Sequence, residues 1–289
     1  TEVLKDSPVA DSPQVAHLTP LMRAFMGSLI ASALGQSLGQ IASTITSAND
    51  VAIPLGMRDA KLIPMNIEEW AQGLNIRMDE VRLFFAVREA AATRLFTHTP
   101  WLAEYIKNLI TSYGRGIRID MEAMQQQAME AMESGQFDME NPESISIAIS
   151  AGLFKPEQTP QQEAALAKLE MAFALIEGWI DNVTTKAIDN RLPSFQPLSE
   201  MLRRRRVSKS PMQHLFATLL GLEVSPRKLR ECTKFWSEVE NQIGIEGRDA
   251  RFEDAALLPT GADLADVSKF LASTTVPDDL SSLFKEDDK

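Results

Sequence analysis

A glutamate flanked by an arginine and an alanine is the feature of this sequence with the clearest chemical meaning. The segment reads Arg88-Glu89-Ala90-Ala91-Ala92 and lies in a stretch that predicts a helix. Side chains four residues apart share one face of a helix, which is the arrangement that two metal ligands on a helix need. Arg88 and Ala92 do not fit this use, because a guanidinium is a permanent cation and alanine carries no donor atom.

Glu89 has two interpretations. It could be a retained general base, or it could be a structural carboxylate paired with Arg88, Arg94 or another basic residue. A lone carboxylate is a weak hydrolytic catalyst when no metal ion acidifies the attacking water. We therefore expect Glu89 to be a vestigial base with a structural use.

A second pair of carboxylates, Glu177 and Asp181, lies one turn apart on a predicted long helix. Together with Glu89 they could bind a hard cation such as Ca²⁺ or Mg²⁺ through oxygen atoms. The alternative is that they form ion pairs with Arg88 and Arg94 across two packed helices, since a buried charge without a partner is costly. We favour the ion pairs, because an arginine lies within the motif itself.

Three further residues are candidates for the wall of a substrate cleft. Trp179 could line it beside the acidic pair, although a core position is the simpler interpretation. His98 could approach the motif from the end of its helix, or it could be a local cap before Pro100. Arg94 is the third candidate. The histidines of the chain are far apart in sequence and do not have the spacing of metal ligands: His17, His98 and His214.

The run Arg203–Arg206 is the strongest basic feature of the chain. It could contact phosphate or nucleic acid, but no aromatic residues are interleaved with it, and nucleic acid is not expected as a partner. We expect a solvated helix end in which some arginines pair inward with acidic residues. The methionine-rich stretch 121–133 is amphipathic and could be either core or an adaptable contact surface.

The periodicity of apolar residues predicts a mainly helical protein. Helices are expected near 20–46, 66–74, 79–96, 100–113, 119–134, 142–150, 161–189, 197–206, 209–220 and 226–243, with short helices after Arg248. Asn66 and Glu69 have the spacing of a capping box at the start of one of them. Two proline-containing pieces between Asp50 and Met65 predict a small hairpin or sheet edge.

The composition bounds the domain organisation and the setting. A chain of 289 residues with 44% hydrophobic residues can form one large domain, and we expect it over 19–272, after a flexible lead at 1–18 and before an acidic tail at 273–289. A sub-boundary is conceivable near 154–160. The formal charge of −11 and the single cysteine favour the cytoplasm. The uncharged stretch 24–49 carries too many glutamines, serines and threonines for a membrane span.

The Arg88-Glu89 motif, the acidic pair Glu177 and Asp181, the run Arg203–Arg206 and several further short segments occur in an order and spacing that resemble a bacterial family of zincin-like metallopeptidases. Its members are described as hydrolases by similarity, and some are grouped with deazaflavin-coenzyme biosynthesis. The resemblance covers about 25–270, and the segments that carry it are Val87-Arg88-Glu89, Arg94-Leu95-Phe96, Pro100-Trp101-Leu102, the run ALIEGWID at 174–181, Arg203–Arg206, Gly221-Leu222-Glu223, Arg227, Arg230, Gly247-Arg248-Asp249 and Leu258-Pro259-Thr260.

Related zinc peptidases carry H-E-x-x-H on a helix, and members of this family usually read R-E-x-x-H. The chain therefore departs from the family at Ala92, where the histidine is missing. The resemblance implies a zincin-like, multi-helical fold with a small strand element near 50–65. It also implies a zinc cofactor whose ligand is lost here, so no metal and no other cofactor is expected.

The leading hypothesis is a degenerate hydrolase that binds a peptide or protein segment in a retained cleft, in a binding or regulatory role. One alternative is an active metal-dependent hydrolase or peptidase with Glu89 as general base and oxygen ligands. Another is a structural interaction protein that docks through its acidic tail or its methionine-rich helix. The sequence indicates no substrate, pathway or oligomeric state.

Overall fold

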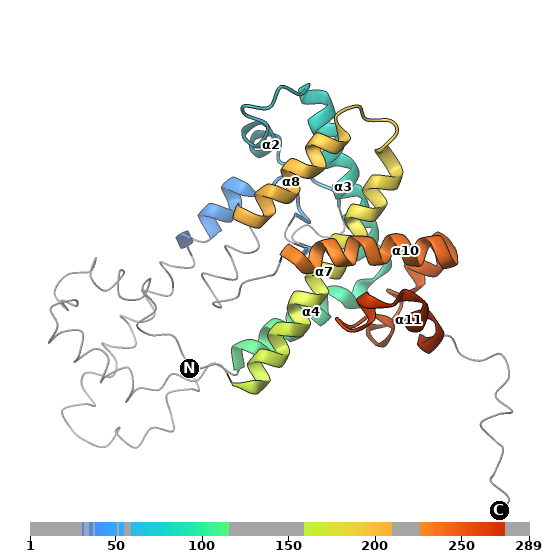
Figure 1. Ribbon diagram of the computed structural model, residues 1–289. Helices are drawn as coiled ribbons and strands as arrows, with labels where there is room; N and C mark the ends of the chain where they lie inside the picture. Colours follow the sequence, from blue (N-terminus) through green and yellow to red (C-terminus); the bar gives the residue numbers. More distant parts are fainter. Residues whose placement is uncertain are drawn as a thin grey trace, which may run out of the picture. The chain divides into compact units, whose positions relative to one another are not determined.

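The computed structural model describes residues 38–50, 52–54, 59–115, 159–209 and 226–274, together with residues 31, 35 and 36. Within these ranges the protein is helical (Figure 1), which confirms the predicted class. The labelled elements are α2 (Pro64–Trp70), α3 (Met78–His98), α4 (Pro100–Arg115), α7 (Pro160–Ile188), α8 (Phe195–Lys209), α10 (Pro226–Ala250), the 3₁₀ turns η2 (Ala255–Leu257) and η3 (Asp263–Ala265), and α11 (Val267–Thr274).

The chain divides into two compact units. One comprises Thr1–Leu34 and Asn108–Lys168, and the other comprises Gly35–Lys107 and Leu169–Lys289. Helices α4 and α7 contribute residues to both units, and every candidate site residue named below belongs to the second unit. The predicted helices at 119–134 and 142–150, the lead and the methionine-rich stretch lie outside the described residues, as do the predicted helix 209–220 after Lys209 and the predicted tail after Thr274.

In the first unit, α7 begins with a reciprocal cap that was not expected from the sequence. The backbone N–H of Thr159 donates to Gln162 Oε1 at 2.9 Å, and the N–H of Gln162 donates to Thr159 Oγ1 at 3.3 Å. Pro160 occupies the first helical position, where its missing N–H costs nothing. Thr159, Pro160 and Gln162 therefore explain why α7 begins at the point where the helical spacing of apolar residues begins.

The extended element near 50–65 is smaller than predicted. In the residues that the structure describes, it consists of one isolated antiparallel bridge between Ser47 and Leu62. Two backbone hydrogen bonds flank the bridge, from Ala48 N to Lys61 O and from Ile63 N to Thr46 O, both at 2.9 Å. The two segments therefore lie side by side without forming a sheet there.

The predicted capping box at Asn66 is wrong. Helix α2 begins two residues earlier, with Pro64 in its first turn and no side-chain cap. The amide of Asn66 instead donates to the carbonyl oxygens of Ala42 and Ile45, at 2.8 and 2.7 Å. Those carbonyls end the preceding helical turns and need a donor, so Asn66 caps the helix before α2 rather than α2 itself.

Helices α2, α3 and α8 share an aromatic core in the second unit. Phe84 and Phe85 of α3 are buried in it, and the ring of Phe85 meets the ring of Trp70 edge to face at 4.9 Å. Phe195 and Leu198 of α8 complete the cluster. This packing fixes the rotation of α3 about its axis, and with it the direction in which the motif residues point.

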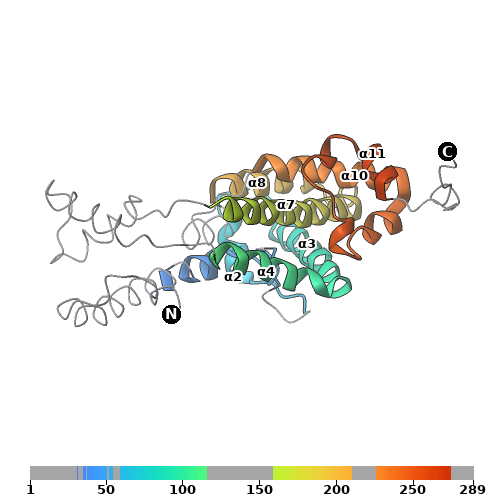
Figure 2. The same ribbon diagram turned by 90° about the horizontal axis from the view of Figure 1, so that it is seen from below.

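Helix α10 lies against α7 (Figure 2), and the contact depends on a glycine. A Cβ atom at Gly178 would stand 2.8 Å from the carbonyl carbon of Cys232. Trp236, fully buried on α10, donates its indole N–H to the carbonyl of Leu175 at 2.9 Å. Further along, α10 kinks at Gly244, which has a φ of 77°, and this is where the sequence predicted that the helix ends.

No helix among the described residues is long and apolar enough to cross a bilayer. Most of the first half of the uncharged stretch 24–49 lies outside those residues.

Cys232 is expected to react very slowly with thiol reagents in the folded protein. Burial raises the pKa of its thiol from 9.0 to about 12, with a smaller contribution from Glu231. At pH 8 the reactive thiolate is then about a thousandfold scarcer than for an ordinary cysteine. Iodoacetamide labelling followed by mass spectrometry measures this. Fast labelling without denaturant would contradict the packing described above.

The same shift has a consequence for stability. The unfolded chain releases the thiol proton above pH 9.0 and the folded chain only near 12. Because the folded state binds the proton more tightly, this group's contribution to stability decreases as the pH rises through that window.

Candidate functional site

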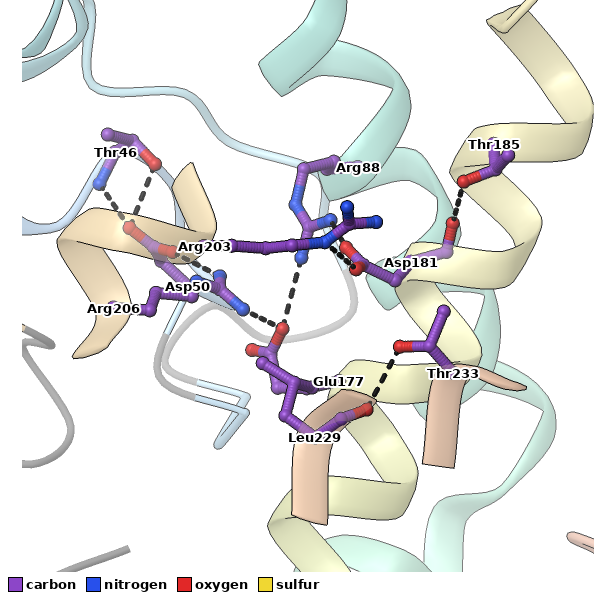
Figure 3. Close-up of polar contacts among 10 residues, drawn as sticks. All are labelled: Thr46, Asp50, Arg88, Glu177, Asp181, Thr185, Arg203, Arg206, Leu229 and Thr233. Carbon is purple, nitrogen blue, oxygen red and sulfur yellow. Dashed lines mark hydrogen bonds and ion pairs between the residues drawn. The ribbon is translucent and has the colours of Figure 1, made fainter. Parts of the chain in front are cut away.

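The motif arginine lies in a buried ion-pair network between α3 and α7 (Figure 3). Arg88 Nη2 donates to Glu177 Oε2 at 3.0 Å, and Arg88 Nη1 donates to Asp181 Oδ1. The side chains of Arg88 and Glu177 are only 7% and 5% exposed. The structure thus pairs Arg88 with Glu177 and Asp181 as expected, whereas Arg94, the other arginine expected there, pairs with Asp249 instead. A charge-assisted bond to each carboxylate compensates for their burial.

Two arginines of α8 complete the network from the other side. Arg206 Nη1 donates to the same Glu177 oxygen, and Arg206 Nη2 donates to Asp50 Oδ1 at 3.1 Å. Arg203 lies with its Nε 3.5 Å from Asp181 Oδ2. The two arginines are three residues apart, so both project from one face of α8. Figure 3 shows them meeting the carboxylates of α7.

Asp50 is held in place by its own segment, since its Oδ2 accepts hydrogen bonds from the backbone N–H and the hydroxyl of Thr46, both at 2.8 Å. Burial and, to a smaller extent, the charge of Arg88 lower the pKa of Arg206 to about 10, while Asp50 acts in the opposite direction. Arg206 is therefore protonated at neutral pH.

The remaining arginines of the run also have partners. Arg205 lies over the ring of Trp70, with 4.8 Å from its guanidinium carbon to the ring centroid. Arg204 is exposed and pairs with Glu200 one turn earlier at 2.8 Å. The prediction that some of the four arginines pair inward is confirmed for Arg203 and Arg206.

Glu89 is bound differently from either interpretation of the sequence. It is 2% exposed, and its carboxylate accepts hydrogen bonds from Asn49 Nδ2 at 2.8 Å, and from the backbone N–H groups of Asn49 and Lys61 at 3.2 Å each. Thr93 Oγ1 lies at 3.5 Å. Arg88 and Arg94 pair with other carboxylates, and among the described residues no side-chain cation pairs with Glu89, because the two bridged segments bring amide donors to it instead. Glu89 therefore fastens the bridge at Ser47 and Leu62 to α3.

The three proposed cleft residues do not lie at this network. Arg94 is exposed and pairs with Asp249 at 3.3 Å. Trp179 is buried and donates its indole N–H to the same aspartate at 3.0 Å. His98 is exposed in the last turn of α3. Their role in a cleft remains a prediction.

Sequence reasoning missed a second buried arginine. Arg248 donates to Asn182 Oδ1 at 2.7 Å and to Glu240 Oε2 at 2.5 Å. Its guanidinium lies 5.2 Å from the ring centroid of Trp179. One feature of the sequence could have indicated this residue: Arg248 and Asp249 directly follow Gly247, beyond the last residue at which the spacing of apolar residues predicts a helix.

A small pocket adjoins the motif, with room for about one water molecule. Ala92, Arg88 and Glu89 reach it from α3. Its other lining residues come from the segment 46–50 and from α3, α7 and α8, and are Thr46, Ser47, Asn49, Asp50, Phe85, Glu177, Ile180 and Arg206. Trp179, Arg94 and His98 are not among them.

The donor set around this pocket does not fit zinc. Zinc in proteins is held chiefly by histidine nitrogen and cysteine sulfur, with some carboxylate oxygens. Here an arginine and an alanine stand at the ligand spacing, and Glu177 and Asp181 are bonded to guanidinium groups. Across the residues with described positions, no three His, Cys, Asp or Glu side chains are arranged to hold a metal ion. His17 and His214 lie outside those residues.

These features define a helical protein whose motif helix carries a buried network of arginine and carboxylate side chains. The chain belongs to the zincin-like metallopeptidases, a family that it matches over residues 2–271. Its fold is similar to that of a solved protein described as a "putative hydrolase with a novel fold" from Chloroflexus aurantiacus, with a TM-score of 0.60 and 19% sequence identity over 88% of this chain and 72% of that one. No curated protein matches the sequence.

Proposed function

We propose that this chain is a non-catalytic member of its family, which has lost the zinc site and acts by binding a peptide or protein segment. The observation that carries the proposal is that the carboxylates beside the motif are already paired, since Glu177 and Asp181 are both bonded to the guanidinium of Arg88, while Ala92 supplies no ligand atom. A fixed cation thus stands beside the carboxylates that a metal ion would need. The acidity of the chain and its single cysteine favour a role in the cytoplasm.

The state of Glu89 supports the same proposal. A general base needs a free lone pair directed at the water that it activates. The oxygens of Glu89 already accept hydrogen bonds from Asn49 and Lys61, and the residue is almost fully buried. Freeing one oxygen would break contacts that hold the bridged segments to α3, so this carboxylate is better suited to structure than to proton transfer.

An oxygen-ligated hard cation is the less favoured alternative. Such a cation takes about six to eight oxygen ligands. To reach Glu177 and Asp181 it would have to displace Arg88 and Arg206, or sit between them and be repelled by both. The ion pairs therefore argue against an active hydrolase that holds its metal ion through oxygen ligands.

Metal content by mass spectrometry tests the proposal. The purified wild type is expected to contain no stoichiometric zinc, and the variant Ala92→His is expected to gain none, because Glu177 and Asp181 remain bonded to the guanidinium groups of Arg88 and Arg206. Ala90→His on the exposed side of the same helix is the matched control. Stoichiometric zinc in the wild type, or peptide hydrolysis that a chelator abolishes, would overturn the proposal.

A further inference from the structure

The bonding of Arg206 indicates which ligand the site would take. We propose that the pocket between Asp50 and Glu177 is a binding site for an arginine side chain of a protein partner, and that Arg206 occupies it from within when the partner is absent. This inference rests on the proposed function and names the chemistry of the ligand.

The first argument is geometric. The two terminal nitrogens of one guanidinium donate to two different carboxylates, Nη1 to Glu177 and Nη2 to Asp50. Both acceptors are also held by contacts other than Arg206: Asp50 by its two bonds from Thr46, and Glu177 by its bond from Arg88. Two acceptors held in this way match the planar fork of an arginine better than the point charge of a lysine.

An independent observation comes from Asn49, which lines the same pocket and is 4% exposed. Its Nδ2 donates to Glu89, and since a carboxylate only accepts, this bond fixes the orientation of the amide. Its Oδ1 is buried and has no hydrogen-bond partner among the described residues. A buried acceptor of this kind needs a donor, which Arg206 does not supply in this structure and which the five N–H groups of a guanidinium on an outside segment, free of the constraint of α8, can supply.

The third argument concerns which part of the network can leave. The side chain of Arg206 is 14% exposed, whereas those of Asp50 and Glu177 are 9% and 5% exposed. Arg206 is the most exposed of the three side chains, and it enters the network from α8. Arg88 remains bonded to Glu177 when Arg206 is withdrawn, so the site stays assembled. Without Arg206, no other guanidinium of the described residues is bonded to Asp50. Its carboxylate can then pair with a cation from a partner.

Chemical rescue tests this inference. Arg206→Ala should unfold at a lower Tm than the wild type, and ethylguanidinium should restore its Tm progressively with the logarithm of concentration. The wild type and Arg204→Ala, which removes an exposed arginine of the same run, should not respond. Ethylammonium should act more weakly, because it lacks the fork. Arg206→Met keeps the apolar stem and is the second variant, in case the alanine variant does not fold.

Binding of a tetra-arginine peptide provides the second readout. Self-occupancy reduces apparent affinity by the fraction of open site, so calorimetry should find at least about tenfold tighter binding to Arg206→Met than to the wild type. Equal binding by both proteins would overturn the inference, as would rescue by Mg²⁺ or Ca²⁺ instead of ethylguanidinium, or no rescue at all. Zinc in the wild type would overturn the proposed function instead, so the two failures are distinguishable.

Discussion

Replacing Glu177 with alanine is expected to lower the free energy of unfolding by about 3–5 kcal/mol, the range found when one partner of a buried ion pair is removed. One oxygen of this carboxylate accepts from both Arg88 and Arg206. The variant would leave two guanidinium groups close together in the interior, and each would lose an acceptor. Repulsion between them adds to the cost of their burial.

Urea denaturation followed by circular dichroism measures the change as a shift in midpoint. Glu177→Gln keeps the shape and removes the charge, so most of the loss should persist. Glu200→Ala is the matched control, because its partner Arg204 is exposed, and exposed pairs contribute about 0–1 kcal/mol. A Glu177→Ala variant as stable as the control would show that the network does not hold α3, α7 and α8 together.

Replacing Gly178 with alanine is expected to destabilise the protein by about 1–3 kcal/mol, the usual cost of overpacking a well-packed interior. The added Cβ would lie 2.8 Å from three atoms of α10: the carbonyl carbon and Cβ of Cys232 and the backbone nitrogen of Thr233. Backbone atoms do not rotate away as the end of a side chain does, so α10 would have to shift. That shift would strain the bond from Trp236 to Leu175.

Thermal unfolding provides the measurement, and Gly114→Ala provides the control. Gly114 lies in α4 with open space where its Cβ would be, so alanine there should be neutral or stabilising by up to about 1 kcal/mol. The opposite signs expected for one substitution at two helical glycines separate packing from helix propensity. A stabilised Gly178→Ala variant would disprove the close contact.

The network also bears on how this member of the family is held together. A structural metal ion and a buried guanidinium can both gather carboxylates from separate elements. Here Arg88 and Arg206 connect α3, the segment at Asp50, α7 and α8 through one glutamate oxygen and two further carboxylates. The proposal of a binding protein and the expected loss on changing Glu177 thus depend on the same atoms.

Much of the helical framework could be predicted because its determinants are local. The expected helices at 79–96, 100–113 and 161–189 correspond to α3, α4 and α7 within a few residues, since apolar spacing and proline act over single turns. Boundaries were less certain where a side chain serves a neighbouring element, as Asn66 does for the helix before α2.

The contacts of the candidate site also divide into those that could be predicted from the sequence and those that could not. Residue types alone excluded Arg88 and Ala92 as metal ligands. The rule that buried charges need partners predicted that Glu177 and Asp181 pair with Arg88 and Arg94, which is correct for Arg88 and wrong for Arg94. Residue types did not indicate that Arg206 reaches Asp50, or that the amides of Asn49 and Lys61 surround Glu89. Those contacts join segments that are distant in the chain. The spacing of apolar residues along a helix does not indicate with which of several acidic residues an arginine will pair. Only the packing of α3, α7 and α8 decided it, because that packing sets which groups are removed from water together and must satisfy one another.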